Sequence, residues 1–423
     1  MGNMKNAKII INGKKRLSGH VRISGAKNAA LPELAAVILS REDFYFQDVP
    51  EVEDIKVMFE ALRNLGATGE LSSNTMKVSI PEVTSALVPK EIVETSRASI
   101  LILGPLVARN GYAKVSKPGG CPIGDRKIDF HLLGLKKMGV DIFEDEEHII
   151  AKAKKSLQSI DYTFHNKTVT GTENLIMAAA LAEGTTILRN CALEPEVSDL
   201  ILLLNSMGSE IHWEPPDTII IKGKTSLNGT KHRMIPDRIE MGTYVIAGCL
   251  GENEITVENA VPEYIDILIN LLKNSGVHVE AGQDSIKVCG NGSFKPIDIE
   301  TLPYPGYPTD LQAQLTTLLT QADGVSHIKE NIFNNRFQHI HELNKMGANI
   351  EVFGDLAMIK GPTPLKGQHI RATDLRASAA LILGGLIAEG TTVMENAYQL
   401  FRGYEKMLEK LEILGADVQE IEG

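Results

Sequence analysis

The stretch Leu181-Ala-Glu-Gly-Thr-Thr-Ile-Leu188 returns almost unchanged as Ile387-Ala-Glu-Gly-Thr-Thr-Val-Met394. A weaker copy reads Cys249-Leu-Gly-Glu-Asn-Glu-Ile-Thr-Val257. In each copy the end of an apolar helical segment is followed by a turn and then by β-branched residues typical of a strand. Self-similarity of this kind indicates that the chain repeats one small α/β module.

A second signal shows how many modules there are. Six times a helical pattern ends in a glycine that is followed by an apparent strand, and successive glycines lie 68 to 73 residues apart. Glycine suits the left-handed position that follows a helix. The six sites are Leu65-Gly66-Ala67, Met138-Gly139-Val140, Met207-Gly208-Ser209, Ser275-Gly276-Val277, Met346-Gly347-Ala348 and Leu414-Gly415-Ala416.

The third module illustrates the expected order of elements. We predict a helix over 171–182, a strand over 185–188, a helix that Pro195 opens and Gly208 ends, and strands over 210–213 and 218–221. Six such modules are too many for one core, so we predict two similar α/β domains of three modules each. The polar segment 224–233 is the best boundary candidate, and the strands expected over 9–17 and 19–23 could complete either half.

Composition limits the functional class. The 423 residues are 43% hydrophobic and 23% charged, as in ordinary globular proteins. The net charge of −11 argues against general nucleic-acid binding. The cysteines at 121, 191, 249 and 289 form no Cys-x-x-Cys pair, which disfavours a zinc or thioredoxin-like site and suits a reducing compartment. The longest apolar run, 379–388, is too short to span a bilayer, and we expect a cytoplasmic protein.

One loop interrupts the second module. It reads Lys117-Pro-Gly-Gly-Cys-Pro-Ile-Gly-Asp-Arg126, and such a loop suits an exposed position rather than a core. The neighbouring Lys117 and Arg126 would lower the pKa of the Cys121 thiol and raise its reactivity. The alternative is a plain surface turn in which the cysteine is incidental.

Two further segments depart from the repeat. In Tyr304-Pro-Gly-Tyr-Pro-Thr-Asp310, either Thr309 or Asp310 would sit at a helix N-cap, or the Asp310 carboxylate would accept a hydroxyl proton. In Ser24-Gly-Ala-Lys-Asn28, small residues let a ligand approach a helix N-terminus, where backbone N–H groups bind anions and Lys27 adds a mobile charge. A solvated helix start is the alternative.

Three arginines, Arg97, Arg376 and Arg402, lie among small residues. Small neighbours leave room for a carboxylate or phosphate that a guanidinium can clamp. Structural ion pairs, with Asp374 or Glu405 as partner, are the alternative. Together a thiol, a carboxylate and gathered cations in an acidic chain indicate an enzyme acting on a phosphorylated and carboxylated small molecule.

At these residues the chain resembles the UDP-N-acetylglucosamine 1-carboxyvinyltransferase family, a family of enolpyruvyl transferases. The resemblance covers residues 9–416. The motifs that carry it, in order, are Ser24-Gly-Ala-Lys-Asn28, Arg97-Ala-Ser99, Pro118-Gly-Gly-Cys-Pro-Ile-Gly124, Pro236-Asp-Arg-Ile-Glu240, Tyr307-Pro-Thr-Asp-Leu-Gln-Ala-Gln314, Asp374-Leu-Arg-Ala-Ser378 and Arg402-Gly-Tyr-Glu405.

The resemblance implies a specific architecture. It consists of two similar inside-out α/β barrels, each built from three βαβαββ-like units, with helices inside, sheets outside and the active site in the interdomain cleft. The expected domains are 26–235, which carries the cysteine loop, and 1–25 together with 236–423.

The implied reaction joins the enolpyruvyl group of phosphoenolpyruvate to the 3-hydroxyl of UDP-N-acetylglucosamine and releases phosphate by addition and elimination. It is the first committed step of peptidoglycan synthesis. Asp310 matches the residue that takes the hydroxyl proton, and Cys121 matches the acid that protonates C3 and is alkylated by the epoxide antibiotic fosfomycin. The expected phosphoenolpyruvate contacts are Lys27, Asn28, Arg126, Arg376 and Arg402, of which Lys27 and Arg402 also count as catalytic.

The expected contacts of the nucleotide sugar come from several segments. They are Arg97, Arg126, Lys127, Ile128, Asp129, Phe130, Thr168, Val169, Thr170, Gly171, Asp310 and Ile332. The resemblance implies no metal and no cofactor. We expect these two small molecules as the partners of a monomer or weak oligomer, with no nucleic acid and no membrane.

Four residues depart from the family's common pattern: Lys127 replaces a proline, Leu193 an arginine, Phe401 an aspartate and Glu33 an apolar residue. They leave open a divergent paralogue with weakened activity or an altered acceptor, or a non-catalytic protein that binds nucleotide sugar. The sister family that uses shikimate 3-phosphate lacks the cysteine loop. RNA 3′-phosphate cyclase shares the repeat but needs a catalytic histidine, and neither His131 nor His339 has a suggestive context.

Overall fold

The computed structural model of the chain describes residues 7–90, 97–117 and 128–421. These residues divide into two compact units. We call residues 25–90, 97–117 and 128–235 the central unit, and residues 7–24 with 236–421 the terminal unit. Each unit has its own hydrophobic core.

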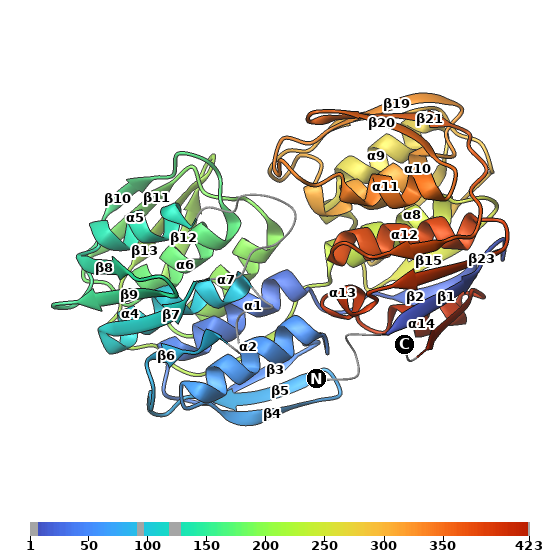
Figure 1. The fold of residues 1–423 in the computed structure, drawn as a ribbon. Helices are drawn as coiled ribbons and strands as arrows, with labels where there is room; N and C mark the ends of the chain where they lie inside the picture. The colour runs from blue at the N-terminus through green and yellow to red at the C-terminus, as the bar shows by residue number, and fades with distance from the viewer. Residues whose placement is uncertain (1–6, 91–96, 118–127, 422–423) are drawn as a thin grey trace. The chain divides into compact units, whose positions relative to one another are not determined.

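The central unit contains three four-stranded sheets (Figure 1). In spatial order they are β14 (Lys231–Arg233), β3 (Phe44–Gln47), β5 (Thr75–Ser79), β4 (Thr68–Ser72); β6 (Leu87–Val88), β7 (Tyr112–Ser116), β9 (His148–Ala153), β8 (Val140–Glu144); and β10 (Asp161–Thr163), β11 (Thr185–Arg189), β13 (Thr218–Lys222), β12 (Glu210–Glu214). Its helices are α1 (Lys27–Ala36), η2 (Val37–Leu39), α2 (Glu53–Asn64), η3 (Arg97–Ile102), α4 (Leu103–Asn110), α5 (Asp129–Lys137), α6 (Val169–Ala179) and α7 (Pro195–Ser206).

The terminal unit repeats the same plan. Its sheets are β2 (Ser18–Arg22), β15 (Glu254–Glu258), β17 (Ser285–Cys289), β16 (His278–Ala281); β18 (Asp298–Glu300), β19 (Gly324–Lys329), β21 (Leu356–Gly361), β20 (Asn349–Phe353); and β22 (His369–Arg371), β23 (Thr391–Glu395), β1 (Lys8–Asn12), β24 (Asp417–Ile421). Its helices are α8 (Arg238–Cys249), η4 (Pro262–Ile265), α9 (Asp266–Ser275), η5 (Thr309–Leu311), α10 (Gln312–Leu319), α11 (Gln338–Lys345), α12 (Leu375–Ile387), α13 (Tyr398–Phe401) and α14 (Met407–Ile413).

Every sheet has one parallel pair followed by two antiparallel pairs, so the predicted sixfold repetition is confirmed. All six glycines of the repeat have φ between +91° and +111° and follow a helix directly or after one residue, which confirms the left-handed position assigned to them. The third module has the predicted elements. Its first helix begins two residues early because the Thr168 hydroxyl caps it by accepting a hydrogen bond from the Gly171 N–H.

The N-terminal strands both belong to sheets of the terminal unit. Strand β1 lies between β23 and β24, with Ile9 opposite Met394 and Glu420, and β2 pairs in parallel with β15. The polar segment 224–233, the boundary candidate, is not a plain linker, because its last residues form β14 and pair with β3.

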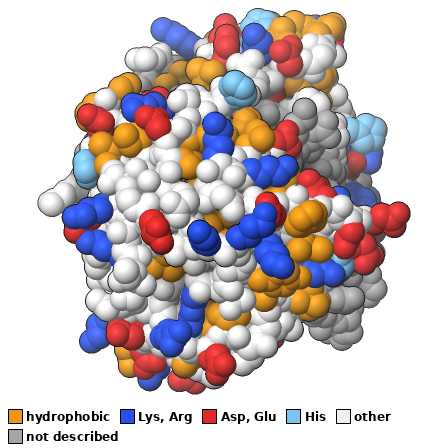
Figure 2. All heavy atoms as spheres, turned by 90° about the vertical axis from the view of Figure 1, so that its left-hand side faces the viewer, with side chains coloured by type: hydrophobic (Ala, Val, Ile, Leu, Met, Phe, Trp, Pro, Cys, Tyr) orange, Lys and Arg blue, Asp and Glu red, His pale blue; other side chains and the backbone are white. Residues whose placement is uncertain are grey.

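Helices occupy the inside of each unit and sheets cover them. Helices α8 and α10 are buried along their whole length, and α10 packs on both α8 and α12. Helices that are buried on every side belong to the core, whereas the strands alternate between buried and more exposed residues and so have one face on the helices. On the face shown in Figure 2, cationic and anionic side chains lie interspersed.

No helix in the described ranges combines the length and the hydropathy that a membrane crossing requires.

Candidate active site

In the terminal unit, Asp310 is held between two arginines. Its Oδ1 accepts a hydrogen bond from Nη2 of Arg336 at 3.1 Å, and its Oδ2 accepts two from Arg376, from Nη2 at 2.7 Å and from Nε at 3.0 Å. The arginine side chains are each 3% exposed, whereas that of Asp310 is 26% exposed. The Asp310 carboxylate is therefore fixed by charge-assisted hydrogen bonds from the two buried arginines and remains accessible to solvent.

Local structure explains how Arg376 reaches this position. Asp374 is the N-cap of α12 and accepts hydrogen bonds from the backbone N–H groups of Arg376 and Ala377 at 2.9 and 3.1 Å. Asp374 therefore orients the first turn of α12, and the guanidinium of Arg376 pairs with Asp310. Burial lowers the pKa of Arg376, but the neighbouring Asp310 carboxylate more than offsets this and raises it above its ordinary value.

The N-cap alternative for Asp310 is wrong. Asp310 lies inside η5, whose N-cap is Pro308 without a side-chain capping bond, and the next helix, α10, has Leu311 at its N-cap position. Thr309 also makes no cap, because its hydroxyl donates to Glu330 at 2.9 Å. The proline-rich approach therefore presents the Asp310 carboxylate to the two arginines rather than to a helix end.

The hydrogen bonds to Asp310 use only some of the nitrogens of the two guanidinium groups. Nη1 of Arg336 and Nη1 of Arg376 are buried and find no hydrogen-bond acceptor among the described residues. Buried polar groups in native proteins nearly always have a partner, so these two nitrogens indicate a missing acceptor. An anionic ligand beside Asp310 would supply one.

Glu330, which was not predicted from the sequence, organises this region. Its buried carboxylate accepts hydrogen bonds from the hydroxyls of Thr301 and Thr309 and from the backbone N–H groups of Ile332 and Phe333, at 2.9 to 3.0 Å. It thereby ties the residue before Asp310 to Ile332, an exposed residue of the predicted set. A lone glutamate after a strand offered no signal that could have revealed this role.

Arg402 follows α13 in the same unit and is half-buried, with Nη1 donating to Oε1 of Gln399 at 3.2 Å. Two residues on, Tyr404 is buried beneath Arg376, whose guanidinium carbon lies 5.4 Å from the ring centre. The Tyr404 hydroxyl accepts from Gln314, which also donates to the backbone carbonyl of Asp310 at 3.0 Å. Tyr404 and Gln314 therefore join the segment of Arg402 to the Asp310 cluster.

Lys27, in the central unit, is buried rather than mobile, and that expectation was wrong. It is the first residue of α1, and its Nζ lies 3.1 Å from the Oδ2 of Asp54 on α2, which is also buried. The preceding turn needs glycine, because a Cβ on Gly25 would lie 1.7 Å from the carbonyl oxygen of Asp48. Asn28, the next predicted residue, is half-buried.

The residues expected to bind the nucleotide sugar form a second group in the central unit. Helices α5 and α6 pack together, which brings 128–130 near 168–171. The Thr170 hydroxyl lies 3.2 Å from Nε2 of His131, and Asn174 lies 2.8 Å from its Nδ1. Burial, and then the charge of Arg97, lower the pKa of His131 to about 3, so its imidazole is neutral.

The two histidines named for the cyclase alternative are both buried. Burial is also the main cause that lowers the pKa of His339 to about 4. A catalytic histidine has to reach its substrate, so these two do not fit that role.

Three predicted residues, Cys121, Arg126 and Lys127, lie outside the described residues. Of the other cysteines, Cys191 and Cys249 are buried and Cys289 is half-buried. Burial raises the pKa of the Cys191 thiol to about 12 and raises that of Cys249 further. These two thiols are therefore inert.

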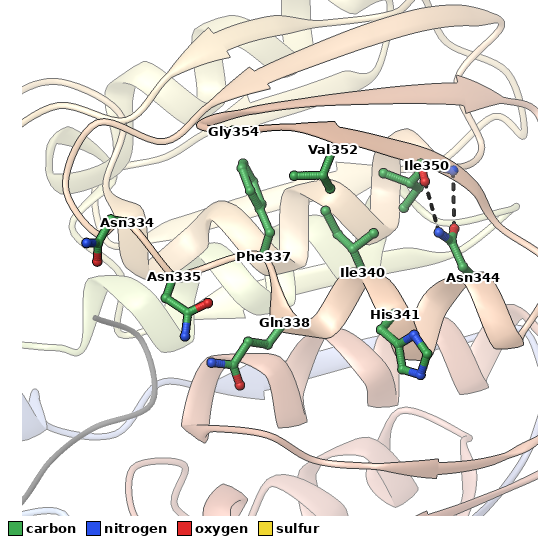
Figure 3. A pocket seen from close by; sticks show the side chains of 10 residues that line it. All are labelled: Asn334, Asn335, Phe337, Gln338, Ile340, His341, Asn344, Ile350, Val352 and Gly354. Carbon is green, nitrogen blue, oxygen red and sulfur yellow. Dashed lines mark hydrogen bonds between the residues drawn. The ribbon is translucent and has the colours of Figure 1, made fainter. Parts of the chain in front are cut away.

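A hollow of about 440 Å³ lies between α11 and β20 (Figure 3). Phe337, Ile340 and Val352 line it, and Asn344 bonds both the N–H and the carbonyl of Ile350 at one end (Figure 3). Its lining, within the part of the chain that is described, includes no predicted site residue.

Comparisons with known proteins give one consistent result. Residues 11–411 match the family model described as EPSP synthase (3-phosphoshikimate 1-carboxyvinyltransferase). A UDP-N-acetylglucosamine 1-carboxyvinyltransferase of Koribacter versatilis is 46% identical over 98% of this chain and 96% of the relative. One of Desulfosudis oleivorans is 47% identical over 98% of this chain and 99% of the relative.

Two solved structures are similar along the whole chain. The enolpyruvyl transferase NikO of Streptomyces tendae has a TM-score of 0.89 at 27% identity and covers 99% of this chain and 100% of its own. An EPSP synthase of Acinetobacter baumannii has a TM-score of 0.76 at 16% identity, with the same coverage, and shows the likeness of fold alone.

Proposed function

The chain belongs to the EPSP synthase family of enolpyruvyl transferases, and from this we propose that it transfers the enolpyruvyl group of phosphoenolpyruvate to the 3-hydroxyl of UDP-N-acetylglucosamine. Relatives at 46–47% identity along almost the whole chain carry this activity in their names. The structural observation that supports it most is the solvent-accessible Asp310 carboxylate between two buried arginines. The reaction is the first committed step of peptidoglycan synthesis, and the unpaired thiols fit a cytoplasmic enzyme.

The reaction has two steps. In the addition, the sugar O3 bonds to C2 of phosphoenolpyruvate while C3 gains a proton, and Asp310 takes the hydroxyl proton. In the elimination, the bond from C2 to the phosphate oxygen breaks, C3 loses a proton, the double bond re-forms and phosphate leaves. Asp310 suits the first role because its orientation is fixed before the substrate arrives.

The arginines support the same chemistry. Arg376 donates hydrogen bonds to Asp310 from Nε and Nη2, so Nη1 is the nitrogen that is left to bind the substrate carboxylate. Lys27 and Arg402, with Arg126, are proposed to hold the phosphate, where fixed positive charge stabilises the negative charge that develops during addition. Cys121 is proposed as the acid that protonates C3.

The nucleotide-sugar contacts are proposed at the N-termini of α5 and α6, at 128–130 and 168–171, with Arg97 beside them. Backbone N–H groups at helix N-termini bind anions, and the buried neutral His131 fixes Thr170 there. Ile332 is proposed as a further contact, held by Glu330.

Phosphate release in the presence of both substrates tests the proposal. We expect turnover with UDP-N-acetylglucosamine and none with shikimate 3-phosphate as acceptor. Asp310→Asn should lower kcat by about 10²–10⁴. Asp298→Asn, which alters an exposed carboxylate beside His327, is the matched control and should retain wild-type turnover. Binding of UDP-N-acetylglucosamine without any phosphate release would instead support the non-catalytic paralogue.

A further inference from the structure

Three ionisable side chains from distant parts of the sequence meet inside the central unit. They are Glu33 on α1, Asp199 on α7 and His232 on β14. One ligand atom from each lies within 4.8 Å of the other two. Together they offer one imidazole nitrogen and two carboxylate oxygens.

Two carboxyl oxygens lie close to the same imidazole nitrogen of His232. Nε2 of His232 lies 3.0 Å from Oδ1 of Asp199 and 3.4 Å from Oε1 of Glu33. An imidazole Nε2 carries at most one N–H, which can point at only one of the two oxygens. Oε1 of Glu33 is the oxygen left without this hydrogen bond.

Glu33 is the member of this cluster whose burial is energetically least favourable. It is fully buried, and neither of its oxygens accepts a hydrogen bond from the residues that the structure describes. Nearby Glu173 is also buried, with Oε1 unbonded in the same part of the chain. Burial of carboxyl groups without hydrogen bonds is costly, and a bound cation would offset that cost. Without an ion, His232 supplies the positive charge, because the effect of burial on its pKa is outweighed by the hydrogen bond to Asp199 and the charges of Glu33 and Asp199, which raise that pKa to about 10.

We propose that Glu33, Asp199 and His232 bind one divalent transition-metal ion, with zinc as the preferred ion. Histidine nitrogen and carboxylate oxygen are both ordinary zinc ligands, and bonds of about 2.0–2.1 Å in a tetrahedron separate ligand atoms by about 3.3–3.4 Å. The separation of 3.4 Å between His232 and Glu33 matches this spacing, and the hydrogen-bonded separation of 3.0 Å between His232 and Asp199 would lengthen slightly on binding. Magnesium and calcium prefer all-oxygen sites with more ligands.

Two surrounding features suit such a site. The second oxygen of Asp199, Oδ2, accepts a hydrogen bond from the Ile235 backbone N–H at 3.2 Å, which fixes the direction of the first. The His232 side chain is 12% exposed and gives solvent access from one side. Ile235 in turn accepts a hydrogen bond from the Ala26 N–H at 2.7 Å, so a bound ion would brace the start of α1.

Metal titration of the full chain tests the proposal. The protein is stripped with a chelator and titrated by calorimetry with Zn²⁺ alone, and separately with Co²⁺ while its visible absorption is recorded. We expect one equivalent of Zn²⁺ to bind and the d–d bands of a four-coordinate cobalt site to appear. Glu33→Gln and His232→Gln should each weaken zinc binding by more than about 100-fold, because even residues that only support metal ligands are worth 10–100-fold.

Thermal unfolding separates loss of the site from loss of the fold. Glu33→Leu removes the buried carboxylate, so the variant should melt at least as high as the metal-free wild type and show no rise in Tm on adding Zn²⁺. Glu258→Gln is the matched control, because it breaks the exposed single-carboxylate pair with His20 and should leave zinc affinity unchanged.

Three results would overturn the proposal. They are no uptake at one equivalent, the same affinity in Glu33→Gln as in the wild type, or a thiolate charge-transfer band that assigns the cobalt to cysteine. Any of them would leave the three side chains as a proton-linked cluster, with a cationic His232 between the carboxyl groups.

Discussion

Arg376 donates two hydrogen bonds to a single oxygen of Asp310, from Nη2 at 2.7 Å and from Nε at 3.0 Å. The second oxygen of Asp310 is bound by Arg336. The carboxylate is therefore fixed at both oxygens by buried cations, and its exposed edge is the part left to meet a substrate hydroxyl.

Arg336→Lys is expected to lower kcat by about tenfold or more and to change the unfolding temperature little. An ammonium cannot reproduce the planar guanidinium contact, so Asp310 would lose its fixed orientation. Steady-state phosphate release measures the effect. Arg109→Lys is the matched control, because Arg109 also bonds through both Nη atoms but only to backbone carbonyls, and its loss should lower stability without lowering kcat. Equal kcat losses in the two variants would contradict a positioning role for Arg336.

Glu330→Ala is expected to raise the KM for the nucleotide sugar and to lower kcat together. The variant leaves the Thr309 hydroxyl and the Ile332 N–H without their acceptor, and these groups position Asp310 and Ile332. Glu330→Gln keeps the shape and most acceptors, so it should recover most of both constants. A purely structural role would lower Tm in the alanine variant but leave KM and kcat unchanged.

Lys27→Met is expected to abolish turnover and to destabilise the fold by about 3 kcal/mol or more, because it removes the ammonium 3.1 Å from the buried Asp54. Chemical denaturation and phosphate release measure the two effects. The double variant Lys27→Met with Asp54→Leu should regain much of the stability and none of the activity. Recovery of activity in the double variant would show that Lys27 serves the fold alone.

Fosfomycin is expected to label Cys121 and to spare the other cysteines. Burial keeps the thiols of Cys191 and Cys249 protonated, and protonated thiols are poor nucleophiles. Mass spectrometry of the treated protein gives the site. Cys121→Ser should lose the adduct and Cys289→Ser should keep it, whereas an adduct on Cys191, Cys249 or Cys289 would contradict the assignment of the reactive thiol.

Acidification is expected to destabilise the protein from about pH 6.5 down to about pH 3 through His131. Its folded pKa is lowered to about 3, so within this window the unfolded chain binds a proton that the folded chain does not. Stability is therefore fully present above the unfolded pKa and falls as pH decreases. His131→Asn should show a shallower decline in denaturation experiments, and the exposed His165→Asn should show the wild-type decline.

The repeat was predictable because its signals are local. Each glycine lies within a few residues of the helix that it ends and the strand that it precedes, so sequence alone located all six. The same holds for Asp310 and Arg376, which were found by their unusual neighbours. What could not be predicted was that these two residues, 66 positions apart, bind each other.

Several residues were missed or misjudged for one physical reason, which is a partner distant in sequence. Lys27 was expected to be mobile because Asp54, on another helix, could not be foreseen as its neighbour. Arg336 and Glu330 were missed because their importance lies in contacts with Asp310 and Thr309 across the unit. Glu33 was noticed only as an unusual residue, since Asp199 and His232 lie more than 160 positions away.

The position of β1 has a consequence for how the protein is made. Residues 8–12 form an inner strand between β23 and β24, whose residues follow about 380 and about 410 positions later in the chain. During translation the backbone groups of this segment remain without their strand partners until β23 and β24 have left the ribosome. This sheet can therefore form only after β24 has been synthesised, whereas the core of the central unit can assemble before it.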